Sequence, residues 1–489
     1  MPLSRDERRL FWLAALIVGA ITLLRIVMLL ATPLQLYPDE AQYWWWAQSP
    51  DWGYFSKPPL IAWLIWLTTR LSDAEWAIRL ASPLLHAATA LMLFAIGRIA
   101  YDARVAFWSA LAYATLPGIS YSATLISTDV PLLFCWAVTL YAFLQAREDN
   151  RWRRPILCGV ALGIGLLAKY AMLYFVLGGI VAALLDARAR RLVLSLRGAL
   201  ILALGLLVLS PNLIWNAAHG YPTLAHTEAN ANWTHAKYNL GNAFAFIAGQ
   251  FGVFGPLMMG GWLATLWHLR REHAPGSATP ILAAFSLPVL ILIIVQSFIS
   301  EANANWAAPA YIAAIPLAVV TLLTWWERGL LWLSLALAAT AMAGLWVVEI
   351  SPALVDRAGF GNALKRQEGW RELGAAVAAE TRAAPYDAIA AANRSVLAEL
   401  LYYAQPRSIP VRAWDRGAIP RDHFQMTMPL RANARRVLLV APPGESAAML
   451  ASFDSHRLIR RLSIPLGRHH QRVLALYDAQ FYRGPQFAR

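Results

Sequence analysis

Residues 10–33 read LFWLAALIVGAITLLRIVMLLATP. A helix rises 1.5 Å per residue, so this stretch is long enough to cross a hydrocarbon core about 30 Å thick. Arg25 is its only charged residue. A helix satisfies its own backbone hydrogen bonds, as a chain in lipid must. The stretch therefore predicts a membrane-spanning helix, and its length favours an uncleaved span over a secretory signal peptide.

Similar apolar stretches recur through the first 350 or so residues, and we expect about eleven spans. They lie near 10–33, 78–98, 104–122, 129–146, 155–170, 172–187, 198–215, 243–268, 279–299, 306–326 and 330–349. Only 14% of the chain is charged, whereas about a quarter of a soluble domain is. With two cysteines, a disulfide scaffold is also excluded. The sequence predicts an α-helical polytopic membrane protein.

Basic residues gather in alternate loops of this predicted topology. They are Arg5, Arg8, Arg9, Arg98, Arg104, Arg147 to Arg154, Arg188 to Arg197, Arg270, Arg271 and Arg328. By the positive-inside rule, these loops and the amino terminus are cytoplasmic. An odd number of spans then leaves the carboxyl end on the opposite side.

The composition changes after about residue 350. About twenty of the 42 Lys and Arg residues fall in the last 140 or so positions, beside strand-like runs such as 437–440 and helical ones such as 395–403. We predict a membrane domain over 1–350 and a small soluble α/β domain over 351–489. The basic charge of the soluble domain has two interpretations: a solvated surface, which we favour, or a surface that holds an acidic lipid-linked substrate.

The first outer loop carries charged residues that a simple turn does not need. Asp39 and Glu40 follow a proline, and Lys57 precedes Pro58 and Pro59. Together they predict a charged pocket at the membrane surface, and residues 60–72 predict a helix lying in the interface. For the intervening Trp44, Trp45 and Trp46 we favour an ordinary aromatic belt.

Two further charged residues lie at predicted span ends. Asp129 is either a helix N-cap or a functional acid, and the sequence favours neither. Lys169 is either a snorkelling anchor or a phosphate ligand. The loop histidines, such as His219 and His226, lack metal-ligand spacing, so no metal site is indicated.

The first-loop pattern Asp39-Glu40, then Tyr54-Phe55-x-Lys57-Pro58-Pro59, resembles the bacterial aminoarabinose transferase and protein O-mannosyltransferase relatives of the GT-C superfamily. Asp129, Lys169 and the late run Asn305-Trp306-x-x-Pro309-x-Tyr311 extend the resemblance. It implies a GT-C fold and a glycosyltransferase that takes a sugar from a polyprenyl-phosphate donor on the periplasmic face of the bacterial inner membrane. The acceptor would be a hydroxyl of a lipid A-like glycolipid or another envelope glycan.

The resemblance also implies roles for individual residues. Asp39 matches the catalytic carboxylate of the first loop, and Asp129 matches a second acid near the acceptor. Lys57 and Tyr311 match ligands of the donor phosphate, and Lys169 matches a lysine common at that turn. We expect Glu40 to contribute to substrate binding beside Asp39. Where aminoarabinose transferases carry a basic residue ahead of the late motif, this chain has Asn303 and Asn305, so the sugar and acceptor are left open.

Elementary chemistry agrees with this reaction. A phosphate leaving group needs charge stabilisation, which a Lys57 ammonium and a Tyr311 hydroxyl supply, worth about 10² to 10³ in rate. An attacking hydroxyl benefits from a carboxylate base, worth about 10² to 10⁴. With one acid and one cation we expect inversion at the anomeric carbon, and no cofactor.

Two alternatives remain open at this stage. Many spans and intramembrane charges also suit a lipid or sugar transporter or flippase, but repeated halves and paired broken helices are not evident in the sequence. A non-catalytic assembly partner would leave the acidic loop idle. The net charge of +14 is divided between the membrane loops and the soluble domain, so we expect no nucleic-acid partner.

Overall fold

A computed structural model describes residues 4–269, 277–324, 329–414, 417, 419–468 and 470–484. The chain divides into two compact units. The first comprises Met1–Leu30, Lys57–Leu64 and Arg79–Trp346, and the second Ala31–Ser56, Ile65–Ile78 and Val347–Arg489. The predicted cytoplasmic residues Arg270, Arg271 and Arg328 lie outside the described residues.

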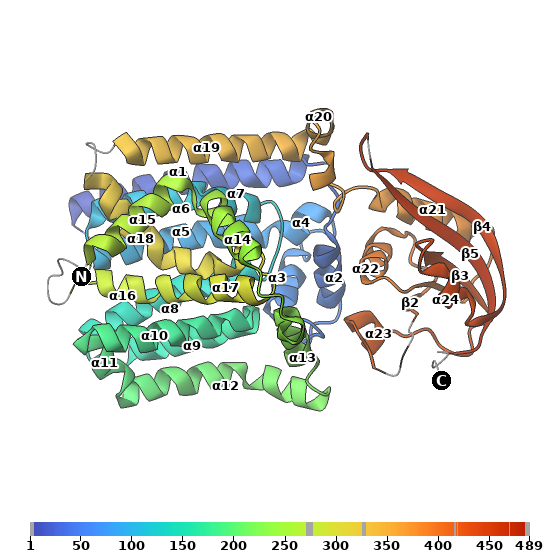
Figure 1. Ribbon diagram of the computed structural model, residues 1–489, viewed down its shortest axis with the longest axis horizontal. Coiled ribbons are helices and arrows are strands. Elements are labelled where there is room, and N and C mark those ends of the chain that lie inside the picture. The colour runs from blue at the N-terminus through green and yellow to red at the C-terminus, as the bar shows by residue number, and fades with distance from the viewer. Residues whose placement is uncertain are drawn as a thin grey trace. The chain divides into compact units, whose positions relative to one another are not determined.

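Helices make up the first unit (Figure 1). They are α1 (Arg5–Ala31), α3 (Leu60–Thr68), α5 (Ala81–Ala100), α6 (Ala103–Thr115), α7 (Pro117–Ser122), α8 (Asp129–Glu148), α9 (Arg153–Ala168), α10 (Tyr174–Leu185), α11 (Ala187–Val193), α12 (Leu196–Ala218), α13 (Pro222–Ala231), α14 (Leu240–Phe254), α15 (Pro256–Leu269), α16 (Thr279–Ala284), α17 (Leu287–Ile299), α18 (Ala308–Thr324) and α19 (Gly329–Ile350). Short 3₁₀ turns occur at Tyr170–Leu173, Trp233–His235 and Ala304–Ala307. Helix α3 continues from the first unit into the second.

Within the described residues, seven helical segments are long and apolar enough to cross a membrane, or eight if the bent pair α14 and α15 counts as one span. The chain is thus a multi-pass membrane protein, but the predicted eleven spans are not confirmed. The predicted span 104–122 breaks at Pro117, since proline lacks the N–H that a continuing helix needs. Helices α9 and α10, with 16 and 12 residues, are shorter than the roughly 20 that a span needs.

Burial separates inner helices from outer ones. In α8 and the segment containing α18, 78% of the apolar window is buried, against 17% in α19 and 28% in α1. Figure 1 shows α12 and α19 on opposite edges of the helical bundle. Interlocked rings of Phe143, Phe175 and Phe285 fill the core between α8, α10 and the turn after α16. The apolar outer helices are therefore the ones that face lipid.

Helices α9 and α12 pack closely through glycine. A Cβ added at Gly163 would lie 2.5 Å from the Cβ of Val208, and one at Gly159 would lie 2.7 Å from the carbonyl oxygen of Ile201. Two small residues four positions apart let helix backbones approach in a membrane, where van der Waals contact replaces hydrophobic drive. This contact supports α9, at whose end Lys169 lies.

Arg25, the charge inside the first predicted span, is buried in α1. Its guanidinium donates to the carbonyl oxygen of Ala114 at 2.6 Å and to the hydroxyl of Ser120 at 3.4 Å. Ala114 lies in the last turn of α6, where carbonyls lack helical partners because Pro117 prevents continuation. The broken helix therefore provides the partner that a buried arginine requires.

The second unit contains a five-stranded sheet in the order β2-β1-β3-β5-β4. Its strands are β1 (Ala388–Ala391), β2 (Val411–Ala413), β3 (Arg436–Ala441), β4 (Phe453–Pro465) and β5 (Gln471–Tyr482). β1 is parallel to both β2 and β3, whereas β5 is antiparallel to β3 and β4. The strand-like run 437–440 thus forms part of β3, whose residues are almost entirely buried.

Helices accompany the sheet in the second unit. They are α2 (Pro38–Ala47), α4 (Glu75–Arg79), α20 (Pro352–Arg357), α21 (Trp370–Ala383), α22 (Arg394–Tyr403), α23 (His423–Thr427) and α24 (Ser446–Leu450). α22, predicted as the helical run 395–403, connects the parallel strands β1 and β2, which need such a crossover. α2 and α4 come from the first loop, so this unit extends beyond the predicted domain 351–489.

Candidate active site

Asp129 begins α8 and is held by side chains from two distant segments. One carboxylate oxygen accepts from the Lys169 ammonium at 2.7 Å, and the other accepts from the Asn305 amide at 2.5 Å. The residue in the N-cap position is Thr128. Because both oxygens of Asp129 bind side chains, the geometry favours a charged centre over the capping interpretation.

This centre is built at three helix ends. Lys169 follows the last turn of α9, and Asn305 lies in the 3₁₀ turn before α18. The Asp129 side chain is 9% exposed and the Lys169 side chain 21%. At such burial, each charge needs the other to offset its desolvation. The structure thus brings Asp129, Lys169 and the late motif together. Their separate positions in the sequence did not predict this contact.

Beside Lys169, a second polar group links the end of α9 to α12. The Tyr170 hydroxyl donates to the side-chain oxygen of Asn212 at 2.7 Å and accepts from the Asn216 amide at 3.3 Å. Both asparagines are fully buried. Neither asparagine was singled out from the sequence, and their four-residue spacing on one helix face was the missed signal.

Tyr311 lies in α18 and is anchored by α14. Its hydroxyl donates to the Gln250 side chain at 2.6 Å, and its ring stacks on Phe254 with centroids 4.2 Å apart. Gln250 in turn donates to the carbonyl of Ala304 at 3.2 Å. Gln250 therefore holds both ends of the segment from Ala304 to Tyr311, and Asp129 also holds the segment through Asn305.

A cavity of about 410 Å³ opens beside this segment. It is lined by Asn230, Asn242, Ala245, Phe246, Gly249, Ser297, Glu301, Ala302, Asn303, Ala304 and Trp306. Amides, a carboxylate and aromatic rings in one concave site are groups that can hydrogen-bond and stack on a sugar. Asn303, one of the two neutral residues noted in the sequence, is among them.

Asp39 lies in the first turn of α2 and pairs with a residue that the sequence did not indicate. Its carboxylate accepts from the Arg394 guanidinium at 2.8 Å, and the same nitrogen donates to Gln42 at 2.9 Å. Burial works against the charge of Arg394, but the charge and hydrogen bond of Asp39, together with Tyr43 and Asp422, raise the arginine's pKa overall. At 40% exposure, the Asp39 side chain remains open to a reactant.

The position of Arg394 follows from its local sequence. The Asn393 side chain caps α22 by accepting from the backbone N–H groups of Ser395 and Val396. Arg394 is thus the first helical residue after β1. No spacing rule links it to the first loop, since 355 residues separate it from Asp39.

Glu40 and Lys57, the other predicted first-loop residues, have different surroundings. Glu40 is buried and accepts from the backbone N–H of Tyr37 at 2.9 Å, which stabilises the start of α2. Lys57 is half-buried and precedes two buried prolines. It belongs to the first unit and Asp39 to the second. Substrate binding by either residue stays a prediction.

Two of the three tryptophans of α2, Trp44 and Trp46, are buried rather than placed in an aromatic belt. Trp44 and Trp46 are at most 1% exposed. Trp46 stacks on Tyr54 at 4.5 Å, and the His423 ring meets both rings edge-on. Burial lowers the pKa of His423 to about 4, although Asp51 opposes the shift. The belt interpretation is therefore wrong for Trp44 and Trp46, which pack inside the second unit.

In the described part of the chain, no three His, Cys, Asp or Glu side chains are grouped as a metal site. The pairs Asp39–Arg394 and Asp129–Lys169 instead present carboxylates with fixed cationic partners. Such groups can bind and orient hydroxyls, accept protons and attract phosphate.

The sequence matches known proteins over most of its length. It is 33% identical over 467 residues to the lipid A galacturonosyltransferase RgtD of Rhizobium johnstonii, which covers 94% of this chain and 97% of the relative. The chain belongs to the GT-C glycosyltransferases of the ArnT and protein mannosyltransferase type. A family model described as dolichyl-phosphate-mannose-protein mannosyltransferase matches residues 56–215 of this GT-C glycosyltransferase.

Solved structures show the same fold. ArnT from Cupriavidus metallidurans, bound to undecaprenyl phosphate, has a TM-score of 0.67 at 19% identity, covering 97% of this chain and 98% of that one. Its apo state has a TM-score of 0.66 at 17% identity, covering 95% and 97%. The resemblance inferred from the first-loop residues is confirmed. Membership in this glycosyltransferase family also sets aside the transporter and assembly-partner alternatives.

Proposed function

We propose that this GT-C glycosyltransferase moves a sugar from a polyprenyl-phosphate donor to a hydroxyl of a lipid A-type glycolipid on the periplasmic face of the bacterial inner membrane. The observation that carries the proposal is the 33% identity, over nearly both full lengths, to a protein named lipid A galacturonosyltransferase. A fold neighbour solved with undecaprenyl phosphate supports an isoprenoid phosphate carrier. We propose a hexuronic acid, galacturonic acid first, as the sugar.

In this proposal, Lys57 and Tyr311 bind the donor phosphate. The C1–O bond to phosphate breaks with its electron pair on the phosphate oxygen, so negative charge grows on the departing polyprenyl phosphate. An ammonium and a hydroxyl directed at that charge lower the barrier without transferring a proton. The role of Tyr311 requires its hydroxyl to exchange Gln250 for a phosphate oxygen.

Asp39 acts as the base in the same step. The acceptor oxygen forms its bond to C1 as its proton passes to the Asp39 carboxylate, and attack opposite the leaving phosphate inverts the anomeric carbon. Arg394 fixes the carboxylate, because one guanidinium nitrogen bridges Asp39 and Gln42. Glu40 supports this helix start and contributes to substrate binding.

Asp129 and Lys169 form the second charged centre of the proposed mechanism. Asn305, which binds Asp129, lies next to Ala304. Ala304 lines the 410 Å³ cavity, whose other lining residues include amides and aromatic rings. We assign Asp129 to the acceptor side and Lys169 to the support of Asp129. No metal or cofactor takes part in the proposed step.

The proposal is tested with purified full-length protein in detergent. The protein is incubated with lipid A and, in turn, with synthetic polyprenyl phosphates carrying galacturonic acid, aminoarabinose or mannose. Product masses are then determined by mass spectrometry. We expect transfer of galacturonic acid and an anomeric configuration opposite to that of the donor, read by NMR. Transfer of aminoarabinose or mannose alone would overturn the choice of sugar, and transfer of none of the three would contradict the proposed reaction.

A further inference from the structure

A cavity of about 540 Å³ in the second unit takes no part in the chemistry above. It is lined by Asp73, Glu75, Arg371, Ala375, Ala378, Arg382, Tyr402, Tyr403, Gln405 and Arg407. These residues come from α4 and its preceding loop, from α21, from the end of α22 and from the loop that follows it. Arginines and tyrosines thus converge on one opening within a single unit.

The charges of this cavity leave it with a net positive character. Its three arginines face two acids. Glu75 is already engaged, since it binds the Arg371 guanidinium at 2.5 Å and accepts from the Tyr403 hydroxyl at 2.8 Å. Among the acids that line the cavity, this leaves Asp73 to balance the exposed Arg382 and Arg407. One cation more than acids favours an anionic ligand.

Two of the residues that line the cavity, Tyr402 and Tyr403, carry aromatic rings. Tyr402 meets the buried Trp44 edge-on at 4.9 Å and Tyr403 at 4.7 Å. The Arg407 guanidinium lies over Trp44, 4.5 Å from the ring centroid, and donates to the Leu401 carbonyl at 3.0 Å. A planar guanidinium fixed in this way is oriented for a carboxylate or phosphate, and rings beside polar side chains suit a sugar.

Helix α22 connects this cavity to Asp39. Arg394, which binds Asp39, is eight residues before Tyr402 on the same helix. At 1.5 Å per residue this is about 12 Å. An extended glycan whose charged group occupies the cavity can therefore reach Asp39 with a hydroxyl on another part of the molecule.

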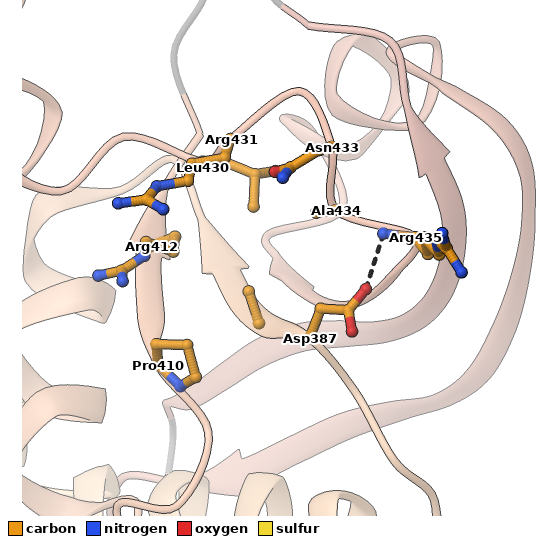
Figure 2. Close-up of a pocket in the computed structure, with 9 residues that line it drawn as sticks. Asp387, Pro410, Arg412, Leu430, Arg431, Asn433, Ala434 and Arg435 are labelled. Atoms are coloured by element: carbon orange, nitrogen blue, oxygen red, sulfur yellow. Dashed lines mark hydrogen bonds between the residues drawn. The ribbon is translucent and has the colours of Figure 1, made fainter.

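A second cavity of the same unit lacks this combination. About 450 Å³ in volume, it is lined by Asp387, Ala388, Pro410, Arg412, Leu430, Arg431, Asn433, Ala434 and Arg435. Figure 2 shows the Arg412 and Arg431 side chains extending to the same side. The Asp387 carboxylate is occupied by the backbone N–H groups of Arg435 and Arg436. This second cavity is lined by arginines but by no aromatic residue, so it serves as the comparison site.

We infer that the cavity between α4, α21 and the end of α22 binds the anionic saccharide of the acceptor, through Arg382 and Arg407 and the rings of Tyr402 and Tyr403. The ligand class is a sugar carrying phosphate or carboxylate. The inference rests on the proposed function for its acceptor, but binding here does not require the sugar-transfer step.

Binding is measured by calorimetry on the full chain in detergent. The probes are a water-soluble glucosamine disaccharide monophosphate, the same disaccharide without phosphate, free galacturonic acid and inorganic phosphate. We expect one of the two anionic sugars to bind at least about tenfold more tightly than the neutral disaccharide, which identifies phosphate or carboxylate as the group recognised. Arg382→Ala/Arg407→Ala is expected to weaken that binding by at least about tenfold, whereas Arg412→Ala/Arg431→Ala leaves it unchanged.

Because Arg407 also packs on Trp44, Arg382→Glu provides a second variant at an exposed position. It reverses one charge without removing that contact and is expected to weaken binding as well. Equal affinity of wild type, Arg382→Glu and the double variant would overturn the inference, as would tighter binding of inorganic phosphate than of either sugar. A protein that binds the sugar but transfers nothing keeps this site and contradicts the proposed function instead.

Discussion

Arg394 holds the carboxylate of Asp39 from a position 355 residues away in the chain. The same guanidinium nitrogen also donates to Gln42, so Arg394 both orients the Asp39 carboxylate on one face of α2 and balances its charge. A base that must approach one acceptor hydroxyl gains from such fixing, because a displacement of about 1 Å costs up to 10² in rate.

Replacing Arg394 tests this role. We expect Arg394→Ala to lower kcat for sugar transfer by about 10- to 100-fold with little change in the donor KM, because the base is misplaced while donor binding is untouched. Arg394→Lys should recover part of the loss, since it keeps the charge but not the planar fork. Steady-state kinetics decide, with Arg412→Ala as the control. A rise in donor KM at constant kcat would contradict a positioning role.

Lys169 and Asp129 allow a double-mutant test. Lys169→Met leaves a nearly buried carboxylate without its cation, which we expect to cost about 3 kcal/mol or more of stability. Adding Asp129→Asn removes the unpaired charge and should restore part of that stability, while transfer stays impaired. Thermal unfolding in detergent measures the first effect and product formation the second. Additive losses in the double variant would show that the pair is not coupled.

His423 predicts a pH dependence of stability. Its pKa is about 4 in the folded protein, against an ordinary value of about 6.5, so the unfolded chain binds more protons between these values. The contribution is complete above about pH 6.5 and declines, by up to roughly 3 kcal/mol, as the pH falls toward 4. His423→Phe should therefore lose less stability between pH 7 and pH 5 than wild type, measured by thermal unfolding. The exposed His456→Phe is the control, and equal slopes for all three proteins would refute the assignment.

Glycine contacts govern the packing of α9 on α12. We expect Gly163→Ala to lower the unfolding temperature, since the new methyl group would lie 2.5 Å from the Cβ of Val208. Gly344→Ala in α19 is the matched control: a Cβ there meets nothing within 4 Å, and alanine favours a helix. Thermal unfolding of the two variants should shift in opposite directions. An unchanged midpoint for Gly163→Ala would show that α9 and α12 can separate at little cost.

The predicted helix ranges agree with the structure where an apolar run is uninterrupted, and they differ where glycine or proline breaks the helix. Helices α1, α8 and α12 lie close to their predicted ranges. The predicted span 243–268 instead bends by 106° between α14 and α15. Gly255, at φ 83°, and Pro256 cause this break, and that Gly-Pro pair was a readable signal.

Functional partners were harder to predict than elements. The first-loop residues could be selected because their charges have no purpose in a plain turn. Arg394 and Gln250 could not be selected, because they act only through partners that the fold brings near. The aromatic belt was wrong for a related reason: a tryptophan run suits both a lipid interface and a buried core, and only packing decides between them.

Each unit contains a charged centre of its own: Asp129 with Lys169 in the first and Asp39 with Arg394 in the second. The family to which the chain belongs makes it a glycosyltransferase. The proposed reaction needs a base for the acceptor, assigned to Asp39, and a cation for the departing phosphate, assigned to Lys57. Neither group alone accounts for the transfer.

The most direct measurement is the single-turnover rate of sugar transfer from a polyprenyl-phosphate donor by Asp39→Asn and Lys57→Ala, each compared with wild type at equal folded fraction. We expect Asp39→Asn to lower the rate by about 10² to 10⁴, and Lys57→Ala by about 10² to 10³ with weaker donor binding. Wild-type rates in both variants would contradict the account.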